Sequence, residues 1–401
     1  MLPLMKYVYL SALLSQLATA ATPSTLSDRD ESSFKWKLKK FKSLVTFGDS
    51  YTDESRFGYF YSHNGSAPPV GWVDPIVSLI YLSLNYLCSR WEKKPNSIKS
   101  NNTASGGYTW ARYVAFDAKV NLYDYAVSGA VCSNEITPRW ISAINGDFPS
   151  VLEYEIPAYV ADSKFTTNGK PFLNIPPSET VYSMWIGTND LGQDAFLTDS
   201  QVPGKTLPDY TECVFSALDK IYANGARFFV LQNVIPLQLA PLYATPGNGG
   251  VYPNPDGTTN VTEVSYRMWE SVKSVNDIYK YQLPYELLIQ NRYPGAQFAL
   301  MDMYSIVRLS LSSHDQTTRT LIVNHQIADI YYNPDQYLAS PANVTGYIEQ
   351  CDASGTCSLA ANQESFLWFN SLHPSWKTDS IIAERFVEVV KGQSKYATYW
   401  G

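Results

Sequence analysis

Short apolar segments that end at a glycine or an amide alternate along this chain with longer segments of helical periodicity. Near-continuous apolar segments are typical of strands that are buried on both faces of a parallel sheet, with helices covering those faces. The alternation therefore predicts an α/β fold in three layers, with a central parallel sheet, helices on both faces and long loop insertions. The predicted strands are 44–47, 120–127, 180–186, 227–234 and 297–303, and the predicted helices are 73–87, 210–224, 272–292 and 379–391.

Gly48, Asp49 and Ser50 follow directly on the first predicted strand. Gly48 allows the backbone to turn sharply, and the Asp49 side chain can cap the turn that follows. Ligands of open parallel sheets bind beyond the carboxyl ends of the strands, so a serine there would contact a bound ligand. A strand followed by a capped helix would give the same tripeptide, so these residues alone identify no function.

Two further strand ends carry groups that are suited to acyl transfer. Gly129 follows the second strand, and its backbone N–H can reach a developing oxyanion because no side chain blocks the approach. Asn189 follows the third strand and can donate a side-chain N–H to the same oxyanion. Asp190 beside it can cap the following turn or hold the loop. Each signal is weak by itself, since most strand-ending glycines form ordinary turns.

His373 lies in a loop before the last predicted helix, where Pro374 favours an extended backbone. An imidazole is a suitable base for a serine nucleophile, although a lone histidine is more often structural. The four histidines show no ligand spacing with one another or with the cysteines, so the sequence predicts no metal site.

The N-terminus has the form of a secretory signal peptide, residues 1–20, with Lys6, an apolar run and a small-residue cleavage site. We expect residues 21–40 to form a polar and basic tail and residues 41–401 a single domain. No later segment has about 18 uninterrupted apolar residues, so we expect a secreted, extracellular monomer without stable membrane association. With a net charge of −7, the sequence lacks the excess of basic residues that is typical of proteins that bind nucleic acids.

Five cysteines follow the predicted cleavage site, and an oxidising compartment would allow two disulfides and one free thiol. Cys351 and Cys357 would close a short loop and are predicted to pair. Cys132 and Cys213 are predicted as the second pair, which leaves Cys88 free. The predicted N-glycosylation sites are Asn64, Asn101, Asn260 and Asn343.

Taken in order, four blocks of this sequence resemble those of the GDSL, or SGNH, hydrolase superfamily. They are Gly48-Asp49-Ser50, Gly129, Gly187-Thr188-Asn189-Asp190 and His373-Pro374. The resemblance covers residues 41–393 and implies a flavodoxin-like SGNH-hydrolase fold. The signal peptide and the stretches SGAVCSN and FLWFNSLHPS most resemble fungal secreted acetylesterases of carbohydrate esterase family sixteen. That family removes acetyl groups from sugars and xylo-oligosaccharides, so the resemblance implies an acetylated mono- or oligosaccharide as substrate.

The resemblance also implies a role for each matching residue. Ser50 would be the nucleophile, and His373 would be its general base and then its general acid. The N–H groups of Ser50 and Gly129 and the amide of Asn189 would form the oxyanion hole. Each such donor lowers the barrier by about 2.7–4 kcal/mol. This chemistry needs no metal and no organic cofactor.

One residue departs from the family pattern, which usually has aspartate three positions before the histidine, where this chain has Asn370. Aspartate fixes the imidazole tautomer and stabilises the imidazolium, and asparagine has no charge for the second task. Three interpretations remain open. Asn370 orients His373 through its side-chain oxygen, a backbone carbonyl serves His373 in a Ser-His dyad, or the protein has lost most activity. We favour a working Ser-His pair with Asn370 as its helper.

Two other functions remain open at this stage. The first is a lipase or phospholipase of the same superfamily, although no long apolar lid segment stands out and the loops near Ser50 are polar and aromatic. The second is a catalytically inactive sugar-binding protein in which tryptophans stack on sugar faces. Its candidate platforms are Trp72, Trp185, Trp368 and Trp376, and the candidate substrate contacts of an esterase are Asp49, Trp72, Asp190, Trp185 and Trp376.

Overall fold

The computed structural model of the protein describes residues 36–74, 103–307, 337–352 and 355–401, which belong to one compact unit, Trp36–Gly401. Several predictions therefore concern residues that lie outside the described ranges. They are the signal peptide at 1–20, most of the tail at 21–40, most of the helix at 73–87, Cys88 and Asn101.

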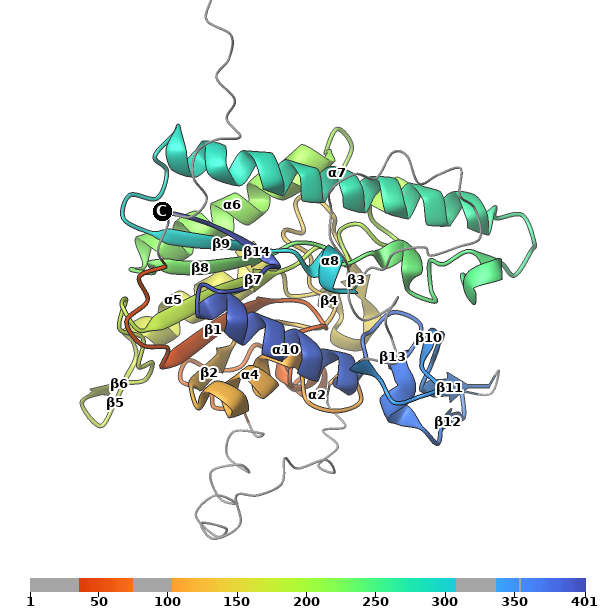
Figure 1. Ribbon diagram of the computed structural model, residues 1–401, viewed down its shortest axis with the longest axis horizontal. Helices are drawn as coiled ribbons and strands as arrows, with labels where there is room; N and C mark the ends of the chain where they lie inside the picture. Colours follow the sequence, from red (N-terminus) through yellow and green to blue (C-terminus); the bar gives the residue numbers. More distant parts are fainter. Residues whose placement is uncertain (1–35, 75–102, 308–336, 353–354) are drawn as a thin grey trace, which may run out of the picture. The chain divides into compact units, whose positions relative to one another are not determined.

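A six-stranded sheet lies at the centre of the unit, in the order β14-β9-β8-β7-β1-β2 (Figure 1). Neighbouring strands from β2 to β9 run parallel, whereas β14 pairs antiparallel with β9 at the edge. In order along the chain, the parallel strands are arranged 2-1-3-4-5, which is the flavodoxin-like doubly wound order. The strands are β1 (Ser43–Gly48), β2 (Asn121–Asp124), β7 (Thr180–Trp185), β8 (Phe228–Gln232), β9 (Gln297–Met301) and β14 (Ala397–Trp400).

Helices and short hairpins connect these strands. The α-helices are α2 (Arg56–Ser62), α4 (Trp110–Ala118), α5 (Ile156–Lys164), α6 (Leu207–Ala223), α7 (Val261–Leu288), α8 (Met303–Val307) and α10 (Trp376–Val390). The short strands are β3 (Trp140–Ile141), β4 (Gly146–Asp147), β5 (Thr166–Thr167), β6 (Lys170–Pro171), β10 (Asn343–Tyr347), β11 (Glu349–Cys351), β12 (Cys357–Leu359) and β13 (Phe366–Trp368). A π-helical turn spans Val151–Glu155, and 3₁₀ turns span Ser142–Ile144, Phe196–Thr198, Leu237–Leu239, Pro246–Asn248 and Gln363–Ser365.

The two faces of the sheet pack against different helices. On one face, Phe47 of β1 packs edge-on against Tyr159 of α5, with ring centroids 5.5 Å apart. On the opposite face, Trp185 of β7 contacts Trp110 of α4 at 6.1 Å, and Trp110 packs against Phe386 of α10 at 4.8 Å. Every residue of β1 and β7 is buried as a result, which explains their near-continuous apolar sequences. The predicted three-layer α/β fold is confirmed.

The helix boundaries differ from the predictions where a capping residue, and not apolar periodicity, determines where the helix begins. The helix predicted at 272–292 begins at Val261, because the Asn260 side chain accepts the N–H of Glu263 and starts the helix within a polar segment. Helix α4 was not predicted, and its N-cap is Thr109, whose side chain accepts the N–H of Arg112. The antiparallel edge strand β14 was also missed, because four residues at a chain end carry little periodicity.

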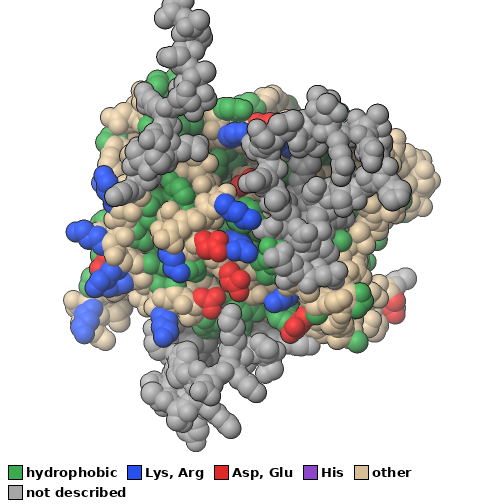
Figure 2. All heavy atoms as spheres, in the orientation of Figure 1, with side chains coloured by type: hydrophobic (Ala, Val, Ile, Leu, Met, Phe, Trp, Pro, Cys, Tyr) green, Lys and Arg blue, Asp and Glu red, His purple; other side chains and the backbone are tan. Residues whose placement is uncertain are grey.

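The surface charges and the helices of the described residues bear on binding to nucleic acids and to membranes. Basic side chains are spaced apart on the face that Figure 2 shows, with acidic side chains between several of them. Within the described ranges, every helix is too short or too polar to cross a membrane. Of the predicted glycosylation sites, Asn64 and Asn260 are exposed and Asn343 is half-buried.

The structure contains both of the disulfides that the sequence predicted. Cys132 pairs with Cys213 of α6 across 81 residues, and Cys351 pairs with Cys357 across 6 residues. The first disulfide joins the segment after β2 to a helix that packs on the sheet, whereas the second closes the exposed hairpin β11–β12. The two therefore differ greatly in the length of chain that they constrain.

We expect the double variant Cys132→Ala/Cys213→Ala to lose about 2 kcal/mol more unfolding free energy than Cys351→Ala/Cys357→Ala. In the chain-entropy model, loops of these lengths contribute about 4.5 and about 2.2 kcal/mol respectively. Urea unfolding of the two variants and the wild type measures the difference. Equal losses in both variants would contradict the expectation.

Candidate active site

Ser50 and His373, which are 323 residues apart in the sequence, lie together at the carboxyl end of β1. The Ser50 Oγ lies 2.7 Å from the His373 Nε2, and the His373 Nδ1 lies 2.9 Å from the Asn370 Oδ1. Ser50 is buried and His373 is half-buried. A hydroxyl, an imidazole and an orienting side chain at these distances form the arrangement that activates a serine nucleophile.

The Asn370 side chain determines which nitrogen of His373 carries the proton. Its Oδ1 also accepts the backbone N–H groups of Leu372 and His373, at 3.0 Å each. Since backbone N–H groups can only donate, the oxygen and not the amide nitrogen of Asn370 faces the turn. The Nδ1–H of His373 therefore donates to this oxygen, which leaves Nε2 free to accept the proton of Ser50. This is the contact that the first interpretation of Asn370 requires.

Neighbouring residues hold the imidazole in place and desolvate it. The ring of Tyr51 packs edge-on against the His373 ring at 5.6 Å, and the Tyr51 hydroxyl donates to the Leu372 carbonyl at 2.9 Å. The Phe369 N–H donates to the carbonyl of His373 at 2.8 Å. Desolvation lowers the pKa of His373 to about 4. The imidazole is therefore held in its neutral form, which is the form that acts as a base.

The three predicted oxyanion donors lie at the ends of β1, β2 and β7. Within the described residues, neither the Ser50 N–H nor the Gly129 N–H donates to another protein group. The Asn189 Nδ2 donates one hydrogen to the Ala130 carbonyl at 2.8 Å, which leaves its second hydrogen available. Gly129 has a φ of +86°, and a Cβ at this position would lie 2.2 Å from the Phe148 ring, so only glycine fits.

A buried carboxylate joins the turn of Ser50 to the turn of Gly129. Asp53 Oδ1 accepts the N–H groups of Ser55 and Arg56 at 2.9 and 2.7 Å. Its Oδ2 accepts the N–H of Ser128 at 2.7 Å and that of Phe57 at 3.1 Å. One side chain thus fixes both turns and the start of α2, which limits their relative motion.

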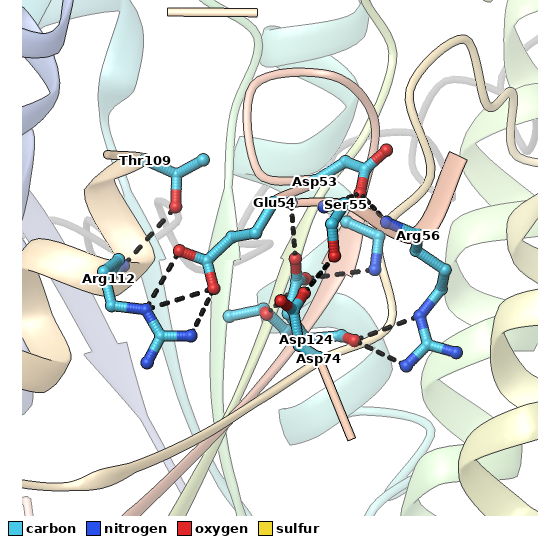
Figure 3. Close-up of polar contacts among 10 residues, drawn as sticks. Asp53, Glu54, Ser55, Arg56, Asp74, Thr109, Arg112 and Asp124 are labelled. Atoms are coloured by element: carbon cyan, nitrogen blue, oxygen red, sulfur yellow. Dashed lines mark hydrogen bonds and ion pairs between the residues drawn. The ribbon is translucent and has the colours of Figure 1, made fainter. Parts of the chain in front are cut away.

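A network of buried charges surrounds this carboxylate (Figure 3). Glu54 forms a two-point ion pair with Arg112 of α4, and both side chains are almost fully buried. On the other side, Asp124 at the end of β2 accepts the Glu54 N–H at 3.1 Å, and its carbonyl accepts two N–H groups of Arg56. The segment that follows Ser50 is therefore anchored to β2 and α4, as a preorganised site requires.

Two of the predicted substrate contacts are buried carboxylates, and the structure corrects their assignment. Asp49 Oδ1 accepts the Tyr51 N–H at 3.1 Å, and burial raises the pKa of this carboxyl to about 6. Asp190 Oδ1 accepts the Cys132 N–H at 3.0 Å and the Thr137 hydroxyl at 3.1 Å, and burial raises its pKa to about 7. Both side chains hold loops together and have no surface for a substrate.

The tryptophans divide into two groups by burial. Trp185 packs against Tyr51 at 5.2 Å, and the Trp368 Nε1 donates to a backbone carbonyl. Both rings are buried, so the prediction that they stack on sugars is wrong. Trp72, which lies 5.1 Å from the Arg56 guanidinium, and Trp376 are both half-buried and remain predicted substrate contacts.

Sequence reasoning missed three residues at this site, namely Tyr51, Arg139 and Phe148. Tyr51 is adjacent to Ser50, and its ring contacts reach residues of the distant His373 loop. The Arg139 Nη1 donates to the Gly129 carbonyl at 2.9 Å and to the Asn189 Oδ1 at 2.7 Å. Its position between the blocks of Gly129 and Asn189 was the signal that could have found it.

Among the described residues, no three His, Cys, Asp or Glu side chains are grouped so as to hold a metal ion.

The sequence matches a family model described as GDSL-like Lipase/Acylhydrolase over residues 44–386, a range that contains Ser50, Gly129, Asn189 and His373. An acetylesterase of Hypocrea jecorina is 38% identical over 366 residues, which cover 90% of this chain and 92% of that protein. An acetylesterase of Thermothelomyces thermophilus is 28% identical over 204 residues, which cover 50% of this chain and 55% of that protein.

One similar solved structure is that of Axe2, an acetylxylan esterase from Geobacillus stearothermophilus. It aligns with a TM-score of 0.35 and 12% identity over 88% of this chain and 96% of that chain. The strand order of the protein itself defines its fold.

We expect the contribution of Asp190 to the free energy of unfolding to decrease by about 2–4 kcal/mol as the pH rises from about 4 to about 7, against an opposite contribution from His373, whose pKa is lowered to about 4. Over this range Asp190 stays protonated in the folded protein, where its pKa is about 7, but ionises in the unfolded chain, where its pKa is 3.8. At Asp190 the folded state therefore binds more protons than the unfolded state, and this part of the stability is lost as the pH increases. Urea unfolding of the wild type and of Asp190→Asn at several pH values measures the difference.

Asp190→Asn is the matched control for this prediction. Asparagine keeps an Oδ1 for the Cys132 N–H and the Thr137 hydroxyl but does not titrate. The variant is expected to lose less stability over the same pH range. An identical slope in the variant and the wild type would contradict the assignment of the slope to Asp190.

Proposed function

The chain belongs to the GDSL-like lipase/acylhydrolase family and is a carboxylic ester hydrolase, and from this premise we propose that it removes acetyl groups from carbohydrates. The observation that carries the proposal is the 2.7 Å contact between the Ser50 Oγ and the His373 Nε2. The similarity to a fungal acetylesterase along nearly the whole chain supports the acetyl group as the acyl part.

In the first half of the proposed reaction, Ser50 attacks the carbonyl carbon of the acetyl ester. The His373 Nε2 takes the hydroxyl proton as the new C–O bond forms, and the carbonyl oxygen becomes an oxyanion. The N–H groups of Ser50 and Gly129 and the amide of Asn189 stabilise this oxyanion. His373 then returns the proton to the sugar oxygen as the ester bond breaks, so that the sugar alcohol leaves and Ser50 carries the acetyl group.

In the second half, water replaces the sugar as the partner of His373. Nε2 takes a proton from water, the resulting hydroxide attacks the acetyl carbonyl, and the same donors stabilise the second oxyanion. Collapse of this intermediate breaks the bond to Ser50, which regains its proton from His373, and acetate leaves. Asn370 accepts the Nδ1–H of His373 throughout, so the imidazole keeps one orientation.

Several features support secretion of the enzyme as part of this proposal. The N-terminal pattern is that of a signal peptide, and sequons lie at the exposed residues Asn64 and Asn260. The two disulfides fit an oxidising compartment.

The half-buried rings of Trp72 and Trp376 are the proposed sugar contacts, because aromatic faces pack well against sugar rings.

Release of acetate from acetylated xylo-oligosaccharides, with Ser50→Ala as the matched variant, tests the proposed function. We expect turnover by the wild type and a loss of about 10⁴-fold or more in the variant, which lacks the nucleophile. We also expect faster hydrolysis of p-nitrophenyl acetate than of p-nitrophenyl palmitate. Preference for palmitate would indicate a lipase, and equal rates for Ser50→Ala and wild type would exclude a serine esterase.

The pH dependence of kcat/KM tests the role of Asn370. Because the pKa of His373 is lowered to about 4, the wild type should keep its activity down to about that pH. In Asn370→Asp, a carboxylate beside Nδ1 stabilises the imidazolium and raises the pKa of His373, so the acid limb should move to higher pH. Activity at neutral pH should be preserved or increased, because the carboxylate stabilises the transition state.

Two outcomes would contradict this account of Asn370. One is a wild-type acid limb near the ordinary histidine pKa of 6.5, which would mean that the ring is not desolvated in solution. The other is a large loss of neutral-pH activity in Asn370→Asp, which would mean that the asparagine nitrogen has a task that aspartate cannot perform.

A further inference from the structure

Arg139 contacts two residues of the proposed oxyanion hole through a single nitrogen. It lies directly before β3, and its half-buried side chain reaches back to the carboxyl ends of β2 and β7. Its Nη1 donates to the Gly129 carbonyl at 2.9 Å and to the Asn189 Oδ1 at 2.7 Å. Arg139 therefore links two of the three donors without occupying either N–H.

The contact with Asn189 decides which way the amide of this side chain points. A guanidinium has only hydrogen-bond donors, so the amide oxygen must face it. The amide nitrogen then lies on the other side, where it donates to the Ala130 carbonyl and keeps one hydrogen available. A flipped amide would place two donors against each other and would remove the N–H from the oxyanion.

The contact with Gly129 limits the motion of a glycine that has no side chain of its own to anchor it. Gly129 has a φ of +86°, and the Phe148 ring packs directly on its Cα. The guanidinium of Arg139 lies 5.1 Å from the centre of the same ring. The Phe148 N–H also donates to the Arg139 carbonyl at 2.8 Å. Arg139 and Phe148 are therefore linked to each other, and both contact Gly129.

No carboxylate of the described residues pairs directly with Arg139, although the buried Asp49 carboxyl interacts with its charge at longer range. Within the described residues, no Asp or Glu oxygen lies within ion-pair distance of this guanidinium. A cation at the oxygen of the Asn189 amide polarises the N–H groups of that amide, and it favours negative charge on the substrate oxygen that they bind.

We propose that Arg139 is the positioning residue of the oxyanion hole, which orients the Asn189 amide and the Gly129 backbone toward the oxyanion and adds a positive charge at the oxygen of the Asn189 amide. This role rests on the proposed esterase function. It acts through the two donors and needs no contact between Arg139 and the substrate.

Arg139→Met tests the proposal, because methionine keeps an apolar stem against Phe148 but removes every donor and the charge. We expect kcat for p-nitrophenyl acetate to decrease about 10²-fold, with KM changing much less, because the lost orientation matters most in the transition state. Arg139→Lys keeps the charge but not the planar two-acceptor geometry, and it should lose about 10-fold. Arg267→Met, which removes a surface arginine that pairs with Asp199, is the control and should match the wild type.

A double-mutant cycle with Asn189→Ala separates positioning from a general structural effect. Asn189→Ala alone should lower kcat by about 10²–10³-fold. If Arg139 acts through Asn189, adding Arg139→Met to Asn189→Ala should cost clearly less than it costs in the wild type. Multiplicative losses in the double variant would overturn the proposal.

The remaining outcomes also decide the question. Unchanged kcat in Arg139→Met, with Ser50-dependent turnover by the wild type, would overturn the role of Arg139 alone. A wild type without Ser50-dependent turnover would overturn the proposed function and this role with it. If urea unfolding shows that Arg139→Met does not fold, the cycle is run with Arg139→Lys, and multiplicative losses there overturn the proposal equally.

Discussion

The hydrogen bond between Ser50 and His373 depends on two turns that are built separately and must meet within 2.7 Å. The turn of Ser50 is fixed by Asp53, which accepts four backbone N–H groups and reaches the turn of Gly129 as well. The turn of His373 is fixed by the Asn370 oxygen, which accepts two backbone N–H groups and the imidazole. In both turns a single side-chain carboxylate or amide replaces the regular hydrogen bonding of secondary structure. The rest of the site is arranged around these two acceptors.

Burial lowers the pKa of His373, the proposed base, and raises the pKa values of the buried carboxyls of Asp49 and Asp190. Desolvation keeps His373 neutral down to a pH of about 4, and it keeps Asp49 and Asp190 protonated up to about 6 and about 7. In solution between about pH 4 and about pH 6, the His373 imidazole is thus unprotonated, and the buried carboxyls of Asp49 and Asp190 are mostly uncharged. An asparagine beside His373 is compatible with this range, whereas an aspartate would oppose it by stabilising the imidazolium. The departure from the usual family residue therefore has a physical consequence beyond the loss of a charge.

The sequence indicated the positions of Ser50, Gly129 and Asn189 because each follows an apolar strand, and the carboxyl ends of parallel strands meet at one edge of the sheet. The same reasoning failed for Trp185 and Asp190, which lie at that edge but point into the core. Which face a side chain takes at a strand end depends on contacts with distant elements, such as Tyr51 for Trp185. Arg139 was missed for a similar reason, since its partners lie after two different strands and no local pattern connects them. The start of α7 at Val261 depended on a cap and not on apolar periodicity.

We propose that Ser50 is made nucleophilic by His373. Reaction with diethyl p-nitrophenyl phosphate followed by peptide mass spectrometry tests this claim most directly, because the reagent phosphorylates an activated serine irreversibly. We expect the diethylphosphoryl group on Ser50, a proportional loss of esterase activity, and much slower labelling in His373→Ala. Labelling of a different residue, or labelling of Ser50 at the same rate without His373, would contradict it.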